Sequence, residues 1–272
     1  MNPTEAAAGQ AGTERSFAGV ARLLGDPALA RLSTARVAVV GLGGVGSWAA
    51  EALCRSGIGC LRLIDLDHVA ESNINRQIQA DLDTLGMAKV EALRARFARI
   101  APSCLIDPVE EFVQPDNLET LLADPLDFVI DAIDDARAKA AMVAFAKRRG
   151  LGIVVCGAAG ARSDPLALVR EDLALTRGDR LLAGVRARLR RDHGFERRAG
   201  RRFRVTALVS RETPLSYQRV AGAGAALACA GYGSIVTVTA AMGIAAASVA
   251  IESITKKSSI DAKSGAESSL QD

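Results

Sequence analysis

The sequence predicts an α/β fold in which helices cover both faces of a doubly wound, mostly parallel sheet. Short apolar runs alternate with amphipathic helical patterns between residues 30 and 160, and this alternation requires right-handed helical crossovers between parallel strands. A glycine-rich junction follows the first of these runs. The chain has 272 residues, 49% of them hydrophobic and 24% charged, so it can bury a core and is not largely disordered.

The expected strands of this sheet are short runs in which apolar residues predominate, as is typical of strands in a covered parallel sheet. We expect them at residues 36–40, 60–64, 105–109, 128–133 and 152–156. The segments between them have the spacing of helices at 44–56, 86–100, 115–122 and 136–149. Pro102 follows the second of these helices and prevents its continuation.

The pattern changes after residue 160. Residues 166–170 and 202–209 are expected to be strands of a second, smaller sheet. Residues 220–251 hold no charged side chain and consist mostly of Ala, Gly, Ser and Thr. Their length permits a membrane span, but weakly apolar residues without flanking aromatics favour a helix buried in the protein. We therefore expect no stable membrane insertion, with membrane association through 232–251 as the less favoured alternative.

The ends of the chain and its cysteines bear on its location. Residues 1–14 and 256–272 have little to bury and are expected to be disordered tails. The N-terminal segment lacks the basic start and apolar run of a secretory signal. The five cysteines are scattered and form no CxxC pair, which argues against structural zinc and a disulfide framework. A reducing cytoplasm is therefore the expected location.

A nucleotide site is predicted at the first junction between a strand and a helix. The loop holds Gly41, Gly43, Gly44 and Gly46, and glycine lets phosphates approach the free N–H groups and positive dipole of a helix N-terminus. Asp65 lies 19 residues after Gly46 (65 − 46), at the end of the second strand, where a carboxylate binds ribose hydroxyls. Together these residues indicate a Rossmann-like, nucleotide-binding sheet.

The residues that follow favour a triphosphate over a nicotinamide dinucleotide. Arg76 and Lys89 add two cations close to the glycine loop, and such charges suit three phosphates better than a pyrophosphate already held by backbone. Asp131, Asp134 and Asp135 gather at the end of the fourth strand. We expect them to face the same crevice, where a carboxylate can hold Mg²⁺ against phosphate oxygens.

Five ordered motifs resemble those of the ubiquitin-activating-type adenylyltransferase superfamily. They are a GxGGxG loop, a D-x-D strand end, an S-N-x-x-R-Q segment, a G-x-x-K helix start and a D-x-x-D strand end. In this sequence they lie at residues 41–46, 65–67, 72–77, 86–89 and 131–134. Because the motifs are ordered along the chain, the resemblance is specific.

The resemblance implies an adenylyltransferase-type enzyme with ATP and Mg²⁺ as cofactors, assembled as a homodimer with two ATP sites. Asp134 would hold the metal and be catalytic together with Arg76 and Lys89, which would stabilise charge at the α-phosphorus. The residues implied to bind the nucleotide are Gly41, Gly43, Gly44, Gly46, Asp65, Asp67, Asn73, Arg76, Gln77, Lys89 and Asp134.

Within this superfamily the likeness is closer to the family of tRNA threonylcarbamoyladenosine dehydratases. The stretches that carry it are residues 21–25, 41–53, 75–78, 131–134 and 229–234. It implies one domain over 15–255, with a nucleotide-binding core at 30–160 and a substrate- and tRNA-binding part at 161–255. The implied reaction adenylates a threonyl carboxylate beside the tRNA anticodon and then closes a ring with loss of water.

One position of the sequence fits a catalytic role known in the superfamily, and another departs from the superfamily's pattern. Cys229 stands where a thioester-forming cysteine can act, so it is a catalytic candidate, and a small buried residue is the alternative. The superfamily often has an arginine after the aromatic residue of its N-terminal segment, but here Ala18 follows Phe17. Arg15 and Arg22 are the nearby arginines that can replace it at a partner's ATP.

An arginine-rich segment predicts a surface for nucleic acid. Residues 186–204 hold nine arginines, opposed by Asp192 and Glu196, in a chain with a net charge of +3. Such a concentration of charge binds a phosphate backbone through counterion release. The residues expected to bind tRNA are Arg186, Arg188, Arg190, Arg191, Arg197, Arg198, Arg201 and Arg202.

Two other functions are weighed against the dehydratase. An activator of a ubiquitin-like sulfur-carrier protein would adenylate a protein C-terminus and act with sulfur-transfer partner proteins. A nicotinamide-binding module is the weakest reading. The arginine-rich segment and the lack of paired CxxC motifs in the sequence favour the dehydratase over the sulfur-carrier activator.

Overall fold

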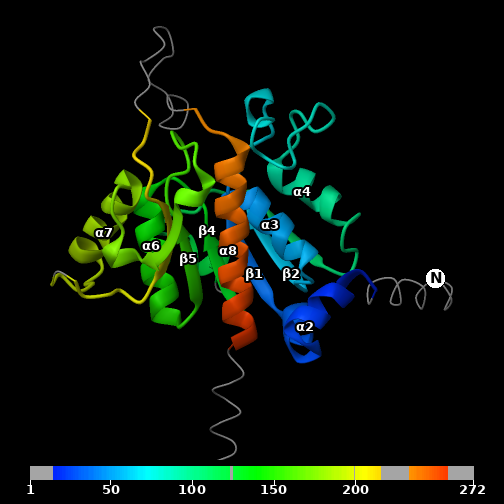
Figure 1. Cartoon of the computed structure of the whole chain (residues 1–272), viewed down its shortest axis with the longest axis horizontal. Coiled ribbons are helices and arrows are strands. Elements are labelled where there is room, and N and C mark those ends of the chain that lie inside the picture. The colour runs from blue at the N-terminus through cyan, green and yellow to red at the C-terminus, as the bar shows by residue number, and fades with distance from the viewer. Residues whose placement is uncertain (1–14, 123–124, 199, 216–232, 257–272) are drawn as a thin grey trace, which may run out of the picture.

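A computed structural model describes residues 15–122, 125–198, 200–215 and 233–256, and its described part is built around a seven-stranded sheet. The order across the sheet is β3-β2-β1-β4-β5-β7-β6 (Figure 1). The strands are β1 (Arg36–Val40), β2 (Cys60–Ile64), β3 (Leu105–Val109), β4 (Phe128–Asp131), β5 (Gly152–Cys156), β6 (Leu168–Asp172) and β7 (Thr206–Ser210). The order reverses between β1 and β4, which is the point where doubly wound sheets bind ligands.

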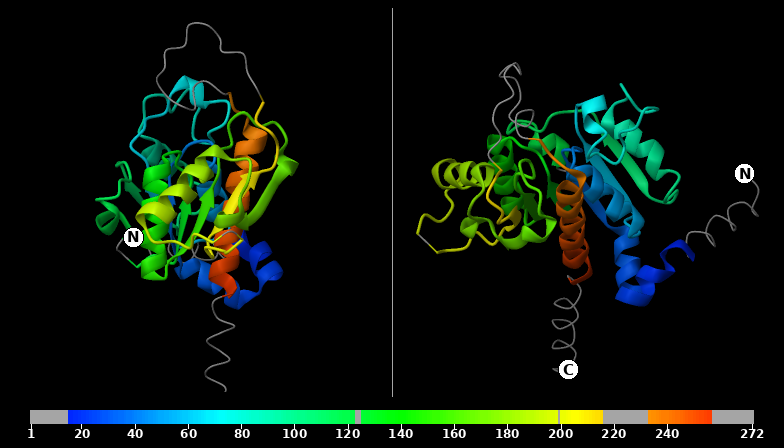
Figure 2. Two further views of the ribbon diagram at one scale, coloured as in Figure 1. Left: turned by 90° about the vertical axis from the view of Figure 1, so that its left-hand side faces the viewer. Right: turned by 45° about the horizontal axis from the view of Figure 1, so that its top comes forward.

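Helices cover both faces of the sheet. They are α2 (Asp26–Thr34), α3 (Gly46–Arg55), α4 (Lys89–Phe97), α5 (Leu118–Leu122), α6 (Ala136–Arg149), α7 (Arg180–Asp192) and α8 (Val236–Lys256), with short 3₁₀ helices η1 (Glu71–Asn73), η2 (Pro165–Ala167) and η3 (Leu173–Leu175). Buried residues of α3, α4 and α8 share one apolar cluster, whereas α5, α6 and α7 pack on the other face. Figure 2 shows α7, in yellow-green, at the end of the molecule opposite to α4.

The central strands alternate between the two layers, as the pleat of a strand requires. In β1, Val37 and Val39 join the cluster under α3 and α8, while Ala38 and Val40 join the cluster under α5 and α6. Their burial on both faces explains why a continuous apolar run identified this strand. The doubly wound, mostly parallel architecture is therefore confirmed.

The expectation of a second, smaller sheet is wrong. Strand β7 pairs in parallel with β5, and β6 then pairs antiparallel with β7, so both extend the main sheet. Leu208 packs into the cluster under α8, whereas Ala207 and Val209 pack under α6 and α7. A strand with apolar residues on both faces is stable inside a covered sheet, and this burial draws β7 against β5.

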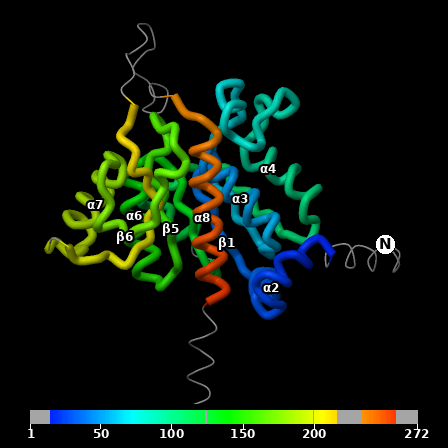
Figure 3. The backbone as a smooth tube through the Cα atoms, in the orientation of Figure 1, coloured from blue at the N-terminus to red at the C-terminus, as the bar shows by residue number. Residues whose placement is uncertain are grey.

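Helix α8 contains residues 236–251 of the apolar segment expected at 220–251 and continues to Lys256. Residues 216–232 lie outside the described ones. Helix α8 lies along α3 and crosses the sheet (Figure 3). Within the described residues it alone is long and apolar enough to cross a membrane, and 50% of its most apolar window is buried inside the protein. Gly243 permits the close packing, because a Cβ there would lie 2.2 Å from the Val45 carbonyl oxygen.

Candidate functional site

The glycine loop lies at the carboxyl end of β1, at the switch point between β1 and β4. Gly41 has a φ of +84°, and a Cβ there would lie 3.0 Å from the Ala132 carbonyl group. A Cβ on Gly46 would lie 1.8 Å from the Gly41 carbonyl oxygen, so this position admits glycine alone. Gly43 has nothing within 4 Å of its Cβ position, which leaves the loop open above the N-terminus of α3.

Asp65 fastens this loop from the end of β2. Its carboxylate accepts hydrogen bonds from the N–H of Leu42 (2.6 Å) and of Asp67 (2.8 Å). Burial raises the pKa of Asp65, while the nearby Lys89 ammonium and the two backbone N–H groups oppose that rise. The carboxylate expected to bind ribose therefore also shapes the loop that is expected to receive the phosphates.

Lys89 begins α4 and is held between two carboxylates. Its Nζ lies 2.7 Å from Asp67 Oδ2 and 3.9 Å from Asp65 Oδ1. The Lys89 side chain is 6% exposed, whereas that of Asp67 is 55% exposed. The lysine is thus fixed in position beneath an accessible carboxylate at the carboxyl edge of the sheet.

Arg76 lies over the glycine loop. Its Cγ is 3.1 Å from the place of a Cβ on Gly44. Its guanidinium donates hydrogen bonds to the Ser72 carbonyl oxygen (2.6 Å) and to Asn75 Oδ1 (2.9 Å). The Trp48 indole donates to the Arg76 carbonyl oxygen at 3.0 Å, so the backbone beneath this arginine is anchored to α3.

Asn73 and Gln77 are buried and support the site through neighbouring groups. Asn73 Oδ1 accepts a hydrogen bond from the Ala70 N–H at 3.1 Å. Gln77 Oε1 accepts one from Gln79 Nε2 (3.1 Å), and the same nitrogen donates to the Leu42 carbonyl oxygen (3.0 Å). Gln79 therefore holds the loop, and sequence reasoning missed it although the Q-x-Q spacing after Arg76 was visible.

The three aspartates at the end of β4 have separate environments, so the expectation that they all face one crevice is wrong. Asp131 and Lys139 are both 0% exposed and form an ion pair of 2.7 Å. Asp135 caps α6 by accepting a hydrogen bond from the Ala138 N–H (2.6 Å). Asp134 is exposed between them.

The Asp131–Lys139 pair braces the turn that carries Asp134. Lys139 Nζ also donates to the Asp131 carbonyl oxygen at 3.2 Å. Burial raises the pKa of Asp131, and the Lys139 ammonium opposes that rise. Ala132 lies next along the chain and touches the glycine loop at Gly41 and Gly46. The pair therefore fixes the wall against which the loop is folded.

The described residues include no group of three or more His, Cys, Asp or Glu side chains that could hold a metal ion by themselves. Mg²⁺ usually keeps several waters and binds through one or two carboxylates together with substrate phosphates. The exposed carboxylate of Asp134, which follows the carboxyl end of β4, fits that mode of binding. Asp134 is thus suited to a metal that arrives with a phosphate ligand.

The arginine-rich segment covers α7 and the loop that follows it. Arg190 lies over the Phe203 ring, 5.1 Å from its centroid. Arg191 pairs with Asp192. Of the arginines expected to bind tRNA, Arg186, Arg188, Arg190 and Arg191 lie on α7, and Arg197, Arg198, Arg201 and Arg202 lie on the loop. Cys229 and its expected role lie outside the described residues.

The open glycine loop, with cations and an exposed carboxylate around it, is the arrangement of an adenylyltransferase-type nucleotide site. Residues 15–268 match the model of the ThiF family, and the chain belongs to this family. It resembles in particular the tRNA threonylcarbamoyladenosine dehydratase of Haemophilus influenzae, which is 40% identical over 249 residues, or 90% of this chain and 95% of the relative.

Comparison with a solved structure shows the same similarity to a dehydratase. The Escherichia coli tRNA N6-threonylcarbamoyladenosine dehydratase in complex with ATP has a TM-score of 0.83 and 39% identity, over 90% of this chain and 96% of that chain. The Escherichia coli molybdopterin-synthase adenylyltransferase is 39% identical over 104 residues, which is 38% of this chain and 41% of the relative. The resemblance inferred from the five motifs is therefore confirmed.

Proposed function

We propose that this protein is an ATP-dependent dehydratase that cyclises threonylcarbamoyladenosine beside the anticodon of tRNA. The observation that carries the proposal is similarity over 90% of the chain to dehydratases of that name, together with a nucleotide crevice of matching type. The sulfur-carrier activator is less well supported, because the molybdopterin-synthase relative matches 38% of the chain.

The proposed chemistry activates a carboxylate. An oxygen of the threonyl carboxylate attacks the α-phosphorus of ATP, a new P–O bond forms, and pyrophosphate leaves. The ureido nitrogen then attacks the activated carbonyl carbon, loses its proton and expels AMP, which closes a five-membered ring. The net change in the nucleoside is loss of one water, and proximity lowers the barrier to ring closure because both groups belong to one molecule.

The side chains around the crevice suit this reaction by position and charge. The glycine loop and the N-terminus of α3 would bind phosphates. Asp65 and Asp67 would contact the ribose, and Arg76 and Lys89 would stabilise the charge that develops at the α-phosphorus. Mg²⁺ held by Asp134 would neutralise charge on the phosphate oxygens.

The proposed partners are tRNA and a second copy of the chain. The arginines of α7 and its following loop supply positive charge for a phosphate backbone. Between η1 and α4 the surface exposes Ile74, Leu82, Leu85 and Met87, with Leu82 77% exposed; such a group of apolar side chains suits an interface between two copies. A cytoplasmic location is proposed with this function, because tRNA is the substrate.

The test is mass analysis of nucleosides after the protein acts on tRNA that carries threonylcarbamoyladenosine. We expect the modified nucleoside to lose the mass of one water, with AMP and pyrophosphate formed in equal amounts when ATP is present. Unchanged nucleoside together with adenylation of a small protein that ends in Gly-Gly would favour the sulfur-carrier activator instead. Sedimentation of the full chain measures its oligomeric state.

A further inference from the structure

A second cationic hollow lies away from the nucleotide crevice. It is an open groove of about 910 Å³, lined by β6, the turn before α7, α7 itself and the residue after β7. Its charged side chains are those of Glu171, Arg177, Arg186, Arg190 and Arg211. Four guanidinium groups therefore meet one carboxylate, which leaves the groove with a charge of +3.

Two of these arginines are held in place by neutral partners. Arg186 donates a hydrogen bond to Thr176 Oγ1. Arg190 lies 5.1 Å from the Phe203 ring centroid and donates from Nε to the Glu196 carbonyl oxygen at 3.3 Å. Because these partners carry no charge, both guanidinium groups are positioned without being neutralised.

The other two arginines are exposed. Within the described residues, the side chains of Arg177 and Arg211 make no hydrogen bond or ion pair. Burial and the neighbouring Arg190 lower the pKa of Arg186, and the carboxylates of Asp179 and Glu171 oppose this. An anion in the groove would relieve the repulsion between these like charges.

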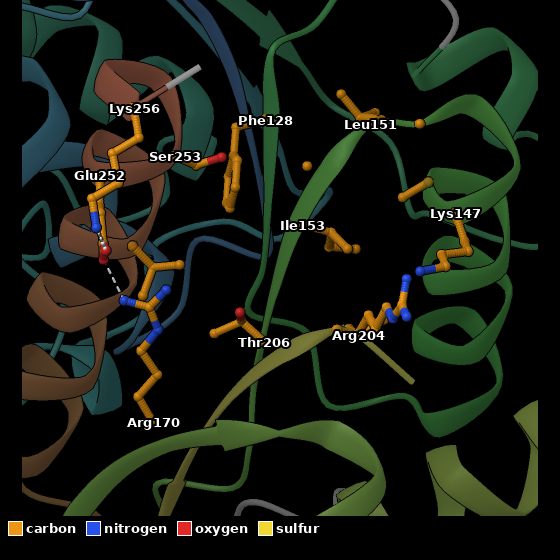
Figure 4. A pocket seen from close by; sticks show the side chains of 15 residues that line it. Phe128, Lys147, Leu151, Ile153, Arg170, Arg204, Thr206, Glu252, Ser253 and Lys256 are labelled. Atoms are coloured by element: carbon orange, nitrogen blue, oxygen red, sulfur yellow. Dashed lines mark hydrogen bonds and ion pairs between the residues drawn. The ribbon is translucent and has the colours of Figure 1, made fainter. Parts of the chain in front are cut away.

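Another cavity of the molecule also holds cationic side chains, but most of them are already paired. It has a volume of about 450 Å³ and lies at the opposite, amino edge of the sheet (Figure 4). There Arg170 and Lys256 both pair with Glu252, and Lys147 donates to the Phe203 carbonyl oxygen. Three of its cationic groups therefore already have partners, and the groove beside α7 is the stronger anion site.

The position of the groove indicates which anion it binds. Arg211 follows β7, and β7 is parallel to β5, so Arg211 lies at the same carboxyl edge of the sheet as the glycine loop. In the order β1-β4-β5-β7 it is three strand spacings away, about 14 Å. A polyanion with one residue in the nucleotide crevice can reach the groove, whereas a single small anion cannot occupy both.

We propose that this groove binds a phosphodiester of the RNA substrate at a distance from the reacting base, with Arg177 and Arg211 as recognition residues beside Arg186 and Arg190. This inference rests on the proposed function. It extends the expected tRNA surface by two arginines outside the 186–204 segment, and it assigns them a fixed site rather than a diffuse positive face. Phosphate could also reach the groove as free pyrophosphate, and the test separates the two sources.

The experiment compares the full chain with an R177A/R211A variant. A matched control, R99A/R148A, removes two exposed arginines that lie outside the groove and make no side-chain bond among the described residues. Binding of threonylcarbamoyladenosine-containing tRNA is measured by filter retention at several salt concentrations. We expect R177A/R211A to bind at least fivefold more weakly and its log–log salt slope to fall by about 1 to 2, at about 0.9 per lost phosphate contact.

The affinity for ATP is measured on the same proteins by calorimetry and should not change in any of them. An R177K/R211K variant keeps both charges and should keep the salt slope.

The inference is overturned if R177A/R211A and R99A/R148A bind tRNA alike while the wild type forms the cyclic nucleoside, in which case the proposed function stands. It is also overturned if R177A/R211A loses binding of inorganic pyrophosphate but keeps its tRNA affinity. A wild type that neither binds tRNA nor forms the cyclic nucleoside would instead overturn the proposed function and this inference with it.

Discussion

Replacing Lys139 by methionine removes one half of an ion pair that is wholly buried at the end of β4. Both side chains are 0% exposed, and Nζ lies 2.7 Å from Asp131 Oδ1. Asp131 Oδ2 is already buried without a hydrogen-bond partner. Methionine has a similar length and would fill most of the space, so the main effect is an uncompensated buried carboxylate.

The expected loss in the free energy of unfolding is about 3–5 kcal/mol, the usual cost of removing one partner from a buried pair. The loss is measured by urea unfolding at pH 8. Because burial raises the pKa of Asp131 above its unfolded value, the destabilisation should be full at high pH. It should shrink as the pH falls toward the ordinary pKa of aspartate, where the folded protein holds a neutral carboxyl group.

The control is the double variant D131N/K139M, in which neither residue carries a charge. At pH 8 it should lose about 1–3 kcal/mol, the cost of a buried polar group with too few partners, and its own unfolding free energy should lack the pH dependence that the Asp131 carboxyl group confers. Two results would refute this reasoning: equal instability of K139M and D131N/K139M at pH 8, or a loss of less than about 1 kcal/mol in K139M. Either would mean that Lys139 does not stabilise the fold by compensating the buried charge of Asp131.

Three further predictions concern the site and the core. A Gly46→Ala chain should lose ATP binding in calorimetry because its Cβ would lie 1.8 Å from a carbonyl oxygen; ATP binding equal to that of the wild type would contradict the steric argument. Asp134→Asn should lower Mg²⁺-dependent AMP formation by about 100-fold or more, and unchanged turnover would remove its proposed role. Burial raises the pKa of the Cys156 thiol to about 12, so iodoacetamide at pH 8 should label it only after unfolding, as peptide mass mapping would show; rapid labelling of the folded protein would refute this.

The local pattern of apolar residues in the sequence was sufficient to predict the strands that are buried on both faces. The expected bounds of β1, β2 and β5 agree with the structure, because an apolar run flanked by turns fixes both ends of a buried strand. The bounds of β3 also agree, although this edge strand is partly exposed. The expected fourth strand extended to residue 133, but β4 ends at Asp131, where the chain turns to form the wall of the glycine loop. Asp131, where β4 ends, pairs with Lys139 on α6. The apolar pattern of the strand does not include that lysine, so it did not predict where the strand ends.

The rest of the site depended on contacts between distant parts of the chain. The roles of Asp131 and Asp135 could not be distinguished from that of Asp134, because pairing and capping depend on where α6 packs. Gln79 was overlooked for a similar reason, since its hydrogen bond to the Leu42 carbonyl oxygen spans 37 positions in sequence. The placement of β7 beside β5 likewise depends on packing against α8, which follows it in the chain.

The contact between α8 and the glycine loop has a consequence for biosynthesis. Thr239 packs on Gly44, with its Cβ 3.1 Å from the place where a Cβ on that glycine would be. The last described element therefore forms part of the wall around the glycine loop, which follows the first strand. A nascent chain that still lacked α8 would hold β1 and the loop without this support. The crevice can therefore be completed only after α8 has emerged from the ribosome, and Thr239 follows Gly44 by 195 residues (239 − 44).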